Sequence, residues 1–162
     1  MNQIKNLSLI GIFMAFVVIA LGAWTRLVDA GLGCPDWPGC YGFVFWPNDE
    51  AEIALAESRF PMFPYDINKA IPEQVHRLFA ASLGLLAIIL VYLSFNKTKN
   101  KSMQRWSAFL LLLICCQGLF GYLTVSLKLL PIIVTIHLFG GFATLTLLYL
   151  SLIHISEPTR HA

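Results

Sequence analysis

The chain has 162 residues, of which 57% are hydrophobic and 12% are charged, and its formal net charge is +2. Soluble domains carry about 25% charged residues, so this composition excludes an ordinary water-soluble domain and a disordered chain. Basic side chains form no cluster outside one loop, which leaves no electrostatic footprint for nucleic acid. We therefore expect no nucleic-acid partner.

Four apolar runs are each long enough to cross a bilayer core, which takes about 20 residues. They predict transmembrane helices at residues 7–27, 71–95, 105–127 and 130–152. The first run is too long for the apolar part of a signal peptide, and Trp24, Thr25 and Arg26 after it do not resemble a cleavage site. The sequence thus predicts an all-α membrane protein, a four-helix transmembrane bundle with a long loop between helices 1 and 2.

The charges on the connections predict the orientation. The long loop, residues 28–70, holds seven acidic and two basic side chains, whereas residues 96–105 hold four basic and no acidic side chains. Lys and Arg in short loops mark the cytoplasmic side of a membrane. We therefore expect a multi-pass protein of the bacterial inner membrane, with both termini cytoplasmic and loop 28–70 external.

The second pair of predicted helices repeats features of the first pair. The matching positions are Gly22 and Gly121, Thr25 and Thr124, Leu27 and Leu127, and His76 and His137. Pro72 and Pro131 each precede the histidine of their pair, and we expect both near a helix start, where a missing amide donor costs nothing. The pattern predicts two helical hairpins related by a weak internal duplication.

His76 and His137 carry the strongest chemical signal, because ionisable groups inside a bilayer are costly and mark function. At about 1.5 Å per residue, they lie roughly 6 and 9 Å below their prolines, so the two imidazoles can share one depth. Facing imidazoles suit the two axial positions of a haem iron, which makes both histidines candidate metal ligands. Alternatively, each makes hydrogen bonds across the bundle. Zinc is disfavoured, because no third intramembrane ligand lies at metal spacing.

Small residues follow each histidine: Ala80 and Gly84 after His76, and Gly140 and Gly141 after His137. They would let a macrocycle approach the backbone, or simply let helices pack closely. Gln117, in the third helix, favours an interhelical hydrogen bond over a role as a ligand.

Three charged residues lie near the predicted external helix ends. Glu73 shares a helical face with His76 and is either a proton acceptor beside a haem or an acid that favours the first turn of a helix. The residues alone favour the second interpretation. Arg26 and Arg77 are either partners of haem propionates or interfacial anchors, and both interpretations stay open.

Cys34 and Cys40 enclose five residues in the predicted external loop, in a compartment where disulfides persist. A structural disulfide is the first interpretation and a redox-active pair the second, because the spacing is not that of a thioredoxin-type site.

Three segments resemble haem A synthases. LGAWTRLVDAGLGCPDWPGCYG, from Leu21 to Gly42, resembles the end of helix 1 and the first external loop of that family. PEQVHRLFAASLG contains an E-x-x-H-R pattern similar to the one that begins the second helix, and QGLFGYLTVSLKLLPIIVTIHLFGG resembles the third and fourth helices.

The resemblance implies an oxidoreductase that converts a methyl group of haem O to a formyl group, giving haem A for terminal oxidases. It implies that His76 and His137 are axial ligands of the substrate haem, that Glu73 is the catalytic carboxylate, and that Cys34 and Cys40 form the external disulfide. Implied partners, besides haem O, are the farnesyltransferase that makes haem O and the terminal oxidase. Membrane lipid and a second copy of the chain are further candidate partners, because a dimer could restore an eight-helix arrangement.

Members of that family have about eight helices in two halves, and the second half is thought to hold a haem b. We therefore expect residues 1–151 to form the amino-terminal half-domain, incomplete as an enzyme by itself. Residues 152–162 resemble translated sequencing-adapter read-through, so we expect a non-native tail and exclude His154 and His161 from the site. Rival functions are a bis-histidine b-type cytochrome, a non-catalytic haem-handover or assembly subunit and, weakest, a quinone-linked thiol oxidoreductase.

Overall fold

The computed structural model describes residues 2–156, which form five α-helices. The helices are α1 (Asn2–Leu27), α2 (Glu50–Arg59), α3 (Ile67–Lys97), α4 (Lys101–Ser126) and α5 (Pro131–Ser156). Among these described residues the only β pairing is an isolated bridge between Cys40 and Phe43. The prediction of an all-α fold is therefore confirmed.

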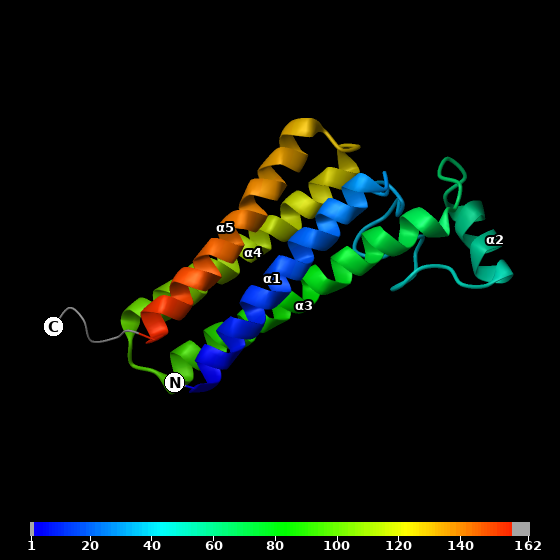
Figure 1. The fold of residues 1–162 in the computed structure, drawn as a ribbon. Coiled ribbons are helices and arrows are strands. Elements are labelled where there is room, and N and C mark those ends of the chain that lie inside the picture. The colour runs from blue at the N-terminus through cyan, green and yellow to red at the C-terminus, as the bar shows by residue number, and fades with distance from the viewer. Residues whose placement is uncertain (1, 157–162) are drawn as a thin grey trace.

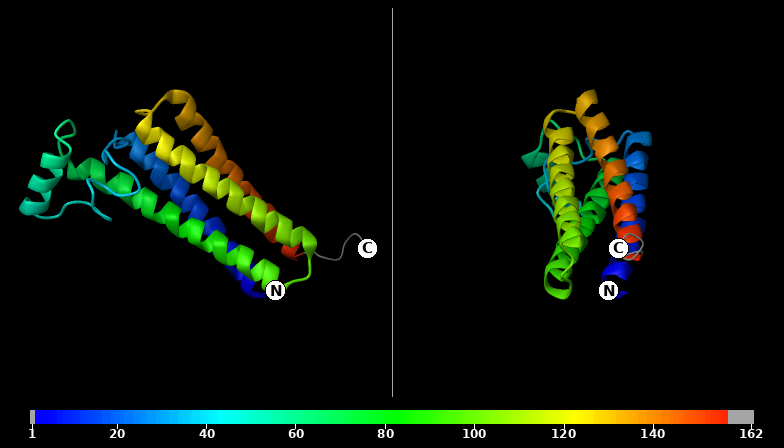
Figure 2. Two further views of the ribbon diagram at one scale, coloured as in Figure 1. Left: turned by 180° about the vertical axis from the view of Figure 1, so that it is seen from behind. Right: turned by 90° about the vertical axis from the view of Figure 1, so that its left-hand side faces the viewer.

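The four long helices form a closed ring in which α1 packs on α3, α3 on α4, α4 on α5 and α5 on α1. The two views of Figure 2 show this bundle from behind and from the left-hand side of Figure 1. The start of α1, the end of α5 and the α3–α4 connection lie at one end of the bundle. The chain between α1 and α3, which contains α2, lies at the other end with the α4–α5 turn (Figure 1). We call this chain the 28–66 segment.

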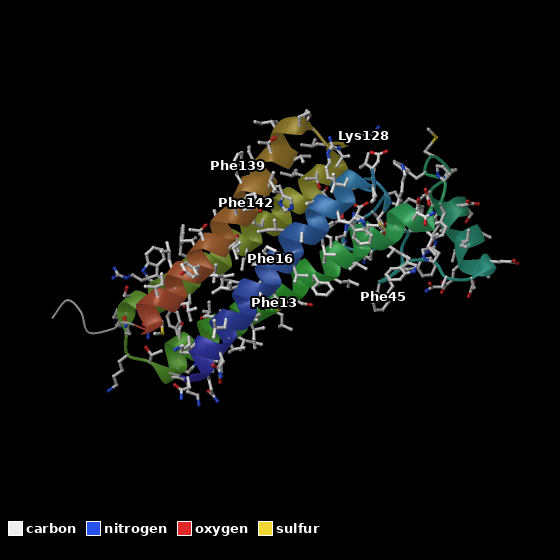
Figure 3. The ribbon with its side chains drawn as sticks, in the orientation of Figure 1. Phe13, Phe16, Phe45, Lys128, Phe139 and Phe142 are labelled. Atoms are coloured by element: carbon white, nitrogen blue, oxygen red, sulfur yellow. A yellow bond between two sulfur atoms is a disulfide. The ribbon has the colours of Figure 1, made fainter. Side chains whose placement is uncertain are left out.

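All four long helices are long and apolar enough to cross a membrane. Their outer faces carry large apolar side chains, including Phe13 and Phe16 on α1 and Phe139 and Phe142 on α5, which Figure 3 labels. Phe13 and Phe139 are 68% and 67% exposed, far more than a large aromatic side chain usually is in a soluble domain. The predicted four-helix transmembrane bundle is therefore confirmed.

The helices are longer than the apolar runs that predicted them. α1 begins at Asn2, and α5 runs to Ser156, four residues past its predicted end. Residues 157–162 of the expected tail lie outside the described residues. α3 begins at Ile67, where the Asp66 side chain accepts a hydrogen bond from the Asn68 amide at 2.9 Å. A carboxylate in this position caps a helix start by satisfying an otherwise unpaired amide.

The early start of α3 corrects the expectation for Pro72. Pro131 is the first residue of α5, as expected, whereas Pro72 is the sixth residue of α3 and lies inside the helix. Only the first four amides of a helix lack an intrahelical acceptor, so proline removes a backbone hydrogen bond at this position. The polar residues before Pro72 hid this start from a search for apolar runs.

The sequence analysis missed α2. Its start is fixed by Asp49, whose side chain accepts from the Glu52 amide, while Glu52 accepts from the Asn48 amide, each at 2.8 Å. This reciprocal pairing is a variant of the capping box, so the Asp49-x-x-Glu52 spacing could have revealed the helix. Ala56 is fully buried on the inner side of α2.

The 28–66 segment has a small core of its own, centred on Tyr41. The Tyr41 ring packs edge to face on Phe60 and Tyr65, with ring centroids 5.7 and 5.3 Å away, and its hydroxyl donates to the Pro64 carbonyl. Burial, reinforced by the neighbouring Tyr65, raises the pKa of the Tyr41 phenol to about 12. The segment is therefore an ordered cap on one end of the bundle.

The opposite end of the bundle holds a layer of hydroxyls. Ser8, Ser94, Ser107 and Ser151, one from each long helix, help to line a cavity of about 10 Å³. The Ser94 and Ser107 hydroxyls are 2.6 Å apart and join α3 to α4.

Candidate functional site

His76 and His137 meet in the interior of the bundle. His76 is the tenth residue of α3 and His137 the seventh of α5, two helices that face each other across the ring. Their ring centroids are 6.5 Å apart and their planes are nearly perpendicular, at 87°. The two imidazoles therefore share one depth, although α3 starts earlier than expected.

This separation suits two ligands of one metal ion. A metal–nitrogen bond is about 2 Å long, and each nitrogen lies about 1.2 Å from its ring centre, so opposite ligands place their ring centres roughly 6.4 Å apart. The observed 6.5 Å agrees with that value. His76 and His137 could therefore hold a haem iron between them.

His76 has the hydrogen bond that a ligating histidine needs. Its Nδ1 lies 3.0 Å from the Val18 carbonyl oxygen of α1, so in the neutral ring Nδ1 carries the proton and Nε2 is free to bind a metal. The ring also lies against Gly22, where a Cβ would come within 3.0 Å of the imidazole Cε1. Gly22 thus makes room for the ring.

His137 lies in a matching place with fewer contacts. A Cβ at Gly121 would be 3.7 Å from the His137 Cε1, so the ring is looser against α4 than His76 is against α1. Its Nδ1 is buried without a hydrogen-bond partner. An orphaned buried nitrogen of this kind is consistent with a site whose ligand organises the ring.

We expected an interhelical hydrogen bond from Gln117, but its buried Oε1 has no hydrogen-bond partner. The side chain lies against Gly140 of α5, where a Cβ would overlap the amide group. The glycines Gly84 and Gly141 face neighbouring helices, since a Cβ at Gly84 would contact Ile114 and one at Gly141 would contact Ile19. The glycines that face the imidazoles are instead Gly22 and Gly121.

Glu73 is buried beneath the loop closed by the Cys34–Cys40 disulfide, which we call the disulfide loop (residues 34–40). The carboxylate is 5% exposed, and its Oε2 accepts from the Cys34 amide at 2.9 Å. Its Oε1 accepts from the Arg77 guanidinium. Both oxygens are therefore engaged within one turn of His76.

Arg77 fastens α3 to the disulfide loop. Its Nη1 donates to the Asp36 and Gly39 carbonyls at 2.8 and 2.5 Å, and its Nη2 donates to the Cys34 carbonyl at 3.4 Å. These contacts are with the protein itself, and the role of Arg77 toward a haem propionate stays a prediction. The salt bridge to Glu73 completes the arrangement.

Two further polar residues, Gln74 and Arg26, lie near the ends of the helices that carry the site. Gln74, which the sequence analysis missed, is fully buried and donates from Nε2 to the Val44 carbonyl at 2.5 Å. In the sequence, its only signal was a polar residue next to Glu73, just before an apolar run. Arg26, in the last turn of α1, is exposed, and its role toward a propionate stays a prediction.

Residues 5–162 match the model of the COX15-CtaA family, described as cytochrome oxidase assembly protein. The chain belongs to this family. Among curated proteins, this COX15-CtaA chain is 44% identical over 148 residues to a protein of Shewanella oneidensis named heme A synthase, covering 91% of the chain and 44% of the relative. It is 28% identical over 131 residues to the heme A synthase of Flavobacterium psychrophilum, covering 72% of the chain and 38% of that relative.

The resemblance to haem A synthases is thus confirmed at the level of the family. The COX15-CtaA chain spans less than half the length of either curated relative. No solved structure matches it. Together with its four apolar helices, the family assignment makes the chain a multi-pass membrane protein. The link of this family to haem comes from the names of the relatives.

Proposed function

We propose that this chain is the haem O site of a haem A synthase, the enzyme that oxidises a methyl group of haem O to the formyl group of haem A. The names of the two curated relatives support the activity. The observation that carries the proposal is the pair of imidazoles, opposed across the bundle with centroids 6.5 Å apart.

In this proposal His76 and His137 hold the substrate haem from opposite sides. The bound haem supplies the iron and the methyl group to be oxidised. The Val18 carbonyl keeps the His76 proton on Nδ1, so Nε2 binds, and Gly22 leaves room for the ring. The disulfide loop covers this end of the bundle and is fastened to the same helix that carries His76.

Glu73 remains the candidate catalytic carboxylate. It is one turn before His76 and is shielded from water, where a carboxylate can accept a proton from a substrate. Its Oε1 is shared with Arg77, so proton transfer to that oxygen would loosen the salt bridge and the disulfide loop together.

The proposed orientation places the 28–66 segment outside the cell membrane and the α3–α4 connection in the cytoplasm. All four basic residues of 96–105 lie at the end of the bundle where α1 starts, opposite the disulfide. This distribution follows the positive-inside rule. Residues 1–151 would be the amino-terminal half of a longer enzyme, whose other half holds haem b, and residues 152–162 a non-native tail.

The proposed partners are those of the whole enzyme. They are haem O, membrane lipid, the farnesyltransferase that delivers haem O and the terminal oxidase that receives haem A. A second copy of the chain is a further candidate partner.

The proposal is tested on the full-length parent protein. Reduced-minus-oxidised spectra of the purified protein, followed by chromatography of the extracted haem, report both binding and product. We expect His76→Ala and His137→Ala each to abolish one low-spin bis-imidazole signal. Unchanged spectra in both variants would exclude the ligand assignment.

A bis-histidine b-type cytochrome is the second candidate function. It is favoured by one observation, that both Glu73 oxygens already have structural partners. Haem extracted from the unmodified parent protein decides between the two candidates, because only the synthase yields haem A. Glu73→Gln then tests the carboxylate: bound but unoxidised haem supports its catalytic role, whereas normal haem A output removes Glu73 from the mechanism. A parent protein that yields no haem A at all would support the cytochrome or a haem-handover subunit.

A further inference from the structure

The two halves of the bundle differ in one hydrogen bond. The Nδ1 of His76 has the Val18 carbonyl as its partner, whereas the Nδ1 of His137 is buried with none. A histidine that ligates a metal almost always donates its other ring N–H to an oxygen, which fixes the tautomer and the ring orientation. One of the two facing histidines therefore lacks an acceptor.

The internal duplication points to the residue that replaces it. Val18 precedes Gly22 by four residues in α1, and Gln117 precedes Gly121 by four residues in α4. Gly22 lies against His76 and Gly121 lies against His137. Gln117 thus occupies, in the second hairpin, the position from which Val18 serves His76 in the first.

Packing brings Gln117 and His137 to the same part of the α4–α5 interface. The Gln117 amide lies against Gly140, which is one turn after His137 on α5. The His137 ring lies against Gly121, which is one turn after Gln117 on α4. The two contacts lie one helical turn apart along the same interface, so the amide and the imidazole lie on adjacent turns.

Each neighbour has an unpaired polar atom of the kind that the other needs. Gln117 has a buried acceptor, Oε1, without a donor, and His137 has a buried Nδ1 without a partner. Buried polar groups normally find partners, because leaving one unpaired carries its full desolvation cost. A hydrogen bond between the two side chains would satisfy both atoms.

We propose that Gln117 is a positioning residue for His137, with its Oε1 accepting a hydrogen bond from the His137 Nδ1–H when Nε2 ligates haem. This inference rests on the proposed function. The hydrogen bond makes His137 a more basic ligand and holds its ring in the binding tautomer. Gly140 leaves space for the Gln117 amide at the interface, since the Cβ of any larger residue would overlap that amide.

The test measures haem affinity and midpoint potential in the full-length parent, for the haem whose signal disappears in His137→Ala. Gln117→Leu keeps the size of the side chain but removes the acceptor, whereas Gln117→Glu supplies an acceptor that can carry charge. Ser107→Ala, on the same helix in the opposite hydroxyl layer, is the matched control.

We expect Gln117→Leu to weaken haem binding by about 10- to 100-fold, the usual effect of losing such a partner, and to raise the midpoint potential. Gln117→Glu should retain tight binding and lower the potential, because a more basic ligand stabilises ferric iron. Ser107→Ala should leave both values unchanged. Potentials of the Leu and Glu variants that equal the wild-type value, or that move in the same direction, would overturn the inference.

The same variants distinguish a failure of the proposed function from a failure of the role of Gln117. If His137→Ala retains every haem signal, the proposed function and this inference both fall. If His137→Ala loses a signal but Gln117→Leu keeps the wild-type affinity and potential, only the role of Gln117 is refuted.

Discussion

The substitution Gly22→Ala tests how closely α1 holds His76. The new Cβ would lie 3.0 Å from the imidazole Cε1 and 3.4 Å from Nδ1, so the ring must move by a few tenths of an ångström. That movement lengthens the 3.0 Å hydrogen bond between Nδ1 and the Val18 carbonyl. The bundle offers an internal control, because Gly121→Ala introduces the same methyl group 3.7 Å from the His137 ring, an ordinary van der Waals contact.

The expected effects follow from three contributions. Overpacking at Gly22 costs about 1–3 kcal/mol, and weakening the hydrogen bond costs about 1 kcal/mol. Replacing glycine by alanine inside a helix returns about 1 kcal/mol. Gly22→Ala should therefore lower the free energy of unfolding by about 1–3 kcal/mol, whereas Gly121→Ala should raise it by up to about 1 kcal/mol.

Thermal unfolding in detergent, followed by circular dichroism, measures both variants under the same conditions. Haem titration adds a second readout, in which Gly22→Ala should bind more weakly and Gly121→Ala should resemble the wild type. Equal stabilities of the two variants would refute the close approach of His76 to α1. A Gly121→Ala variant less stable than Gly22→Ala would mean that His137 packs more closely on α4 than His76 packs on α1.

The cap at the end of the bundle yields three further predictions. Arg77→Leu leaves the Glu73 carboxylate buried without its partner and should cost about 3–5 kcal/mol in thermal unfolding. Adding Glu73→Leu should recover only part of this loss, because the loop carbonyls and the Cys34 amide stay without these partners; a double variant as unstable as the single one would contradict this. Reduction of the Cys34–Cys40 bond should cost about 2 kcal/mol by loop entropy and speed proteolysis of the 28–66 segment, and unchanged cleavage would argue against a structural role. Because the pKa of Tyr41 is raised from 10.0 to about 12, the unfolded phenol loses its proton first, so the segment should lose stability as pH rises from 10 to 12. Tyr41→Phe should flatten that dependence in proteolysis measured against pH, and an equally steep profile in this variant would assign the loss to another group.

The transmembrane helices could be predicted because each of them depends on the same property, a long run of apolar residues. Long apolar runs without charge must be helical in a bilayer, and the histidines stood out against them. The matched depth of His76 and His137 followed from counting residues after Pro72 and Pro131, and it held because the counts were measured from the same end of the bundle. The starting residue of α3 did not follow, since Asp66 caps a polar turn that has no hydropathy signal.

The contacts of the cap could not be predicted for a different reason. Arg77 binds backbone carbonyls of the disulfide loop, and a carbonyl has no sequence signature. The partner of His76 is also a backbone oxygen, that of Val18, which the apolar side chain conceals. Side-chain chemistry thus revealed which residues matter, whereas their partners required the folded backbone.

The hydrogen bonds of Arg77 to the disulfide loop also restrict the rotation of α3 about its own axis. His76 and Arg77 are consecutive, so their side chains leave the helix axis about 100° apart. Arg77 is tethered to the carbonyls of the disulfide loop, and Trp37 of that loop rests edge to face on Tyr122 of α4, with ring centroids 5.9 Å apart. The disulfide loop therefore limits the rotation of α3 about its own axis relative to α4. It keeps α3 at the rotation angle at which His76 faces the centre of the bundle.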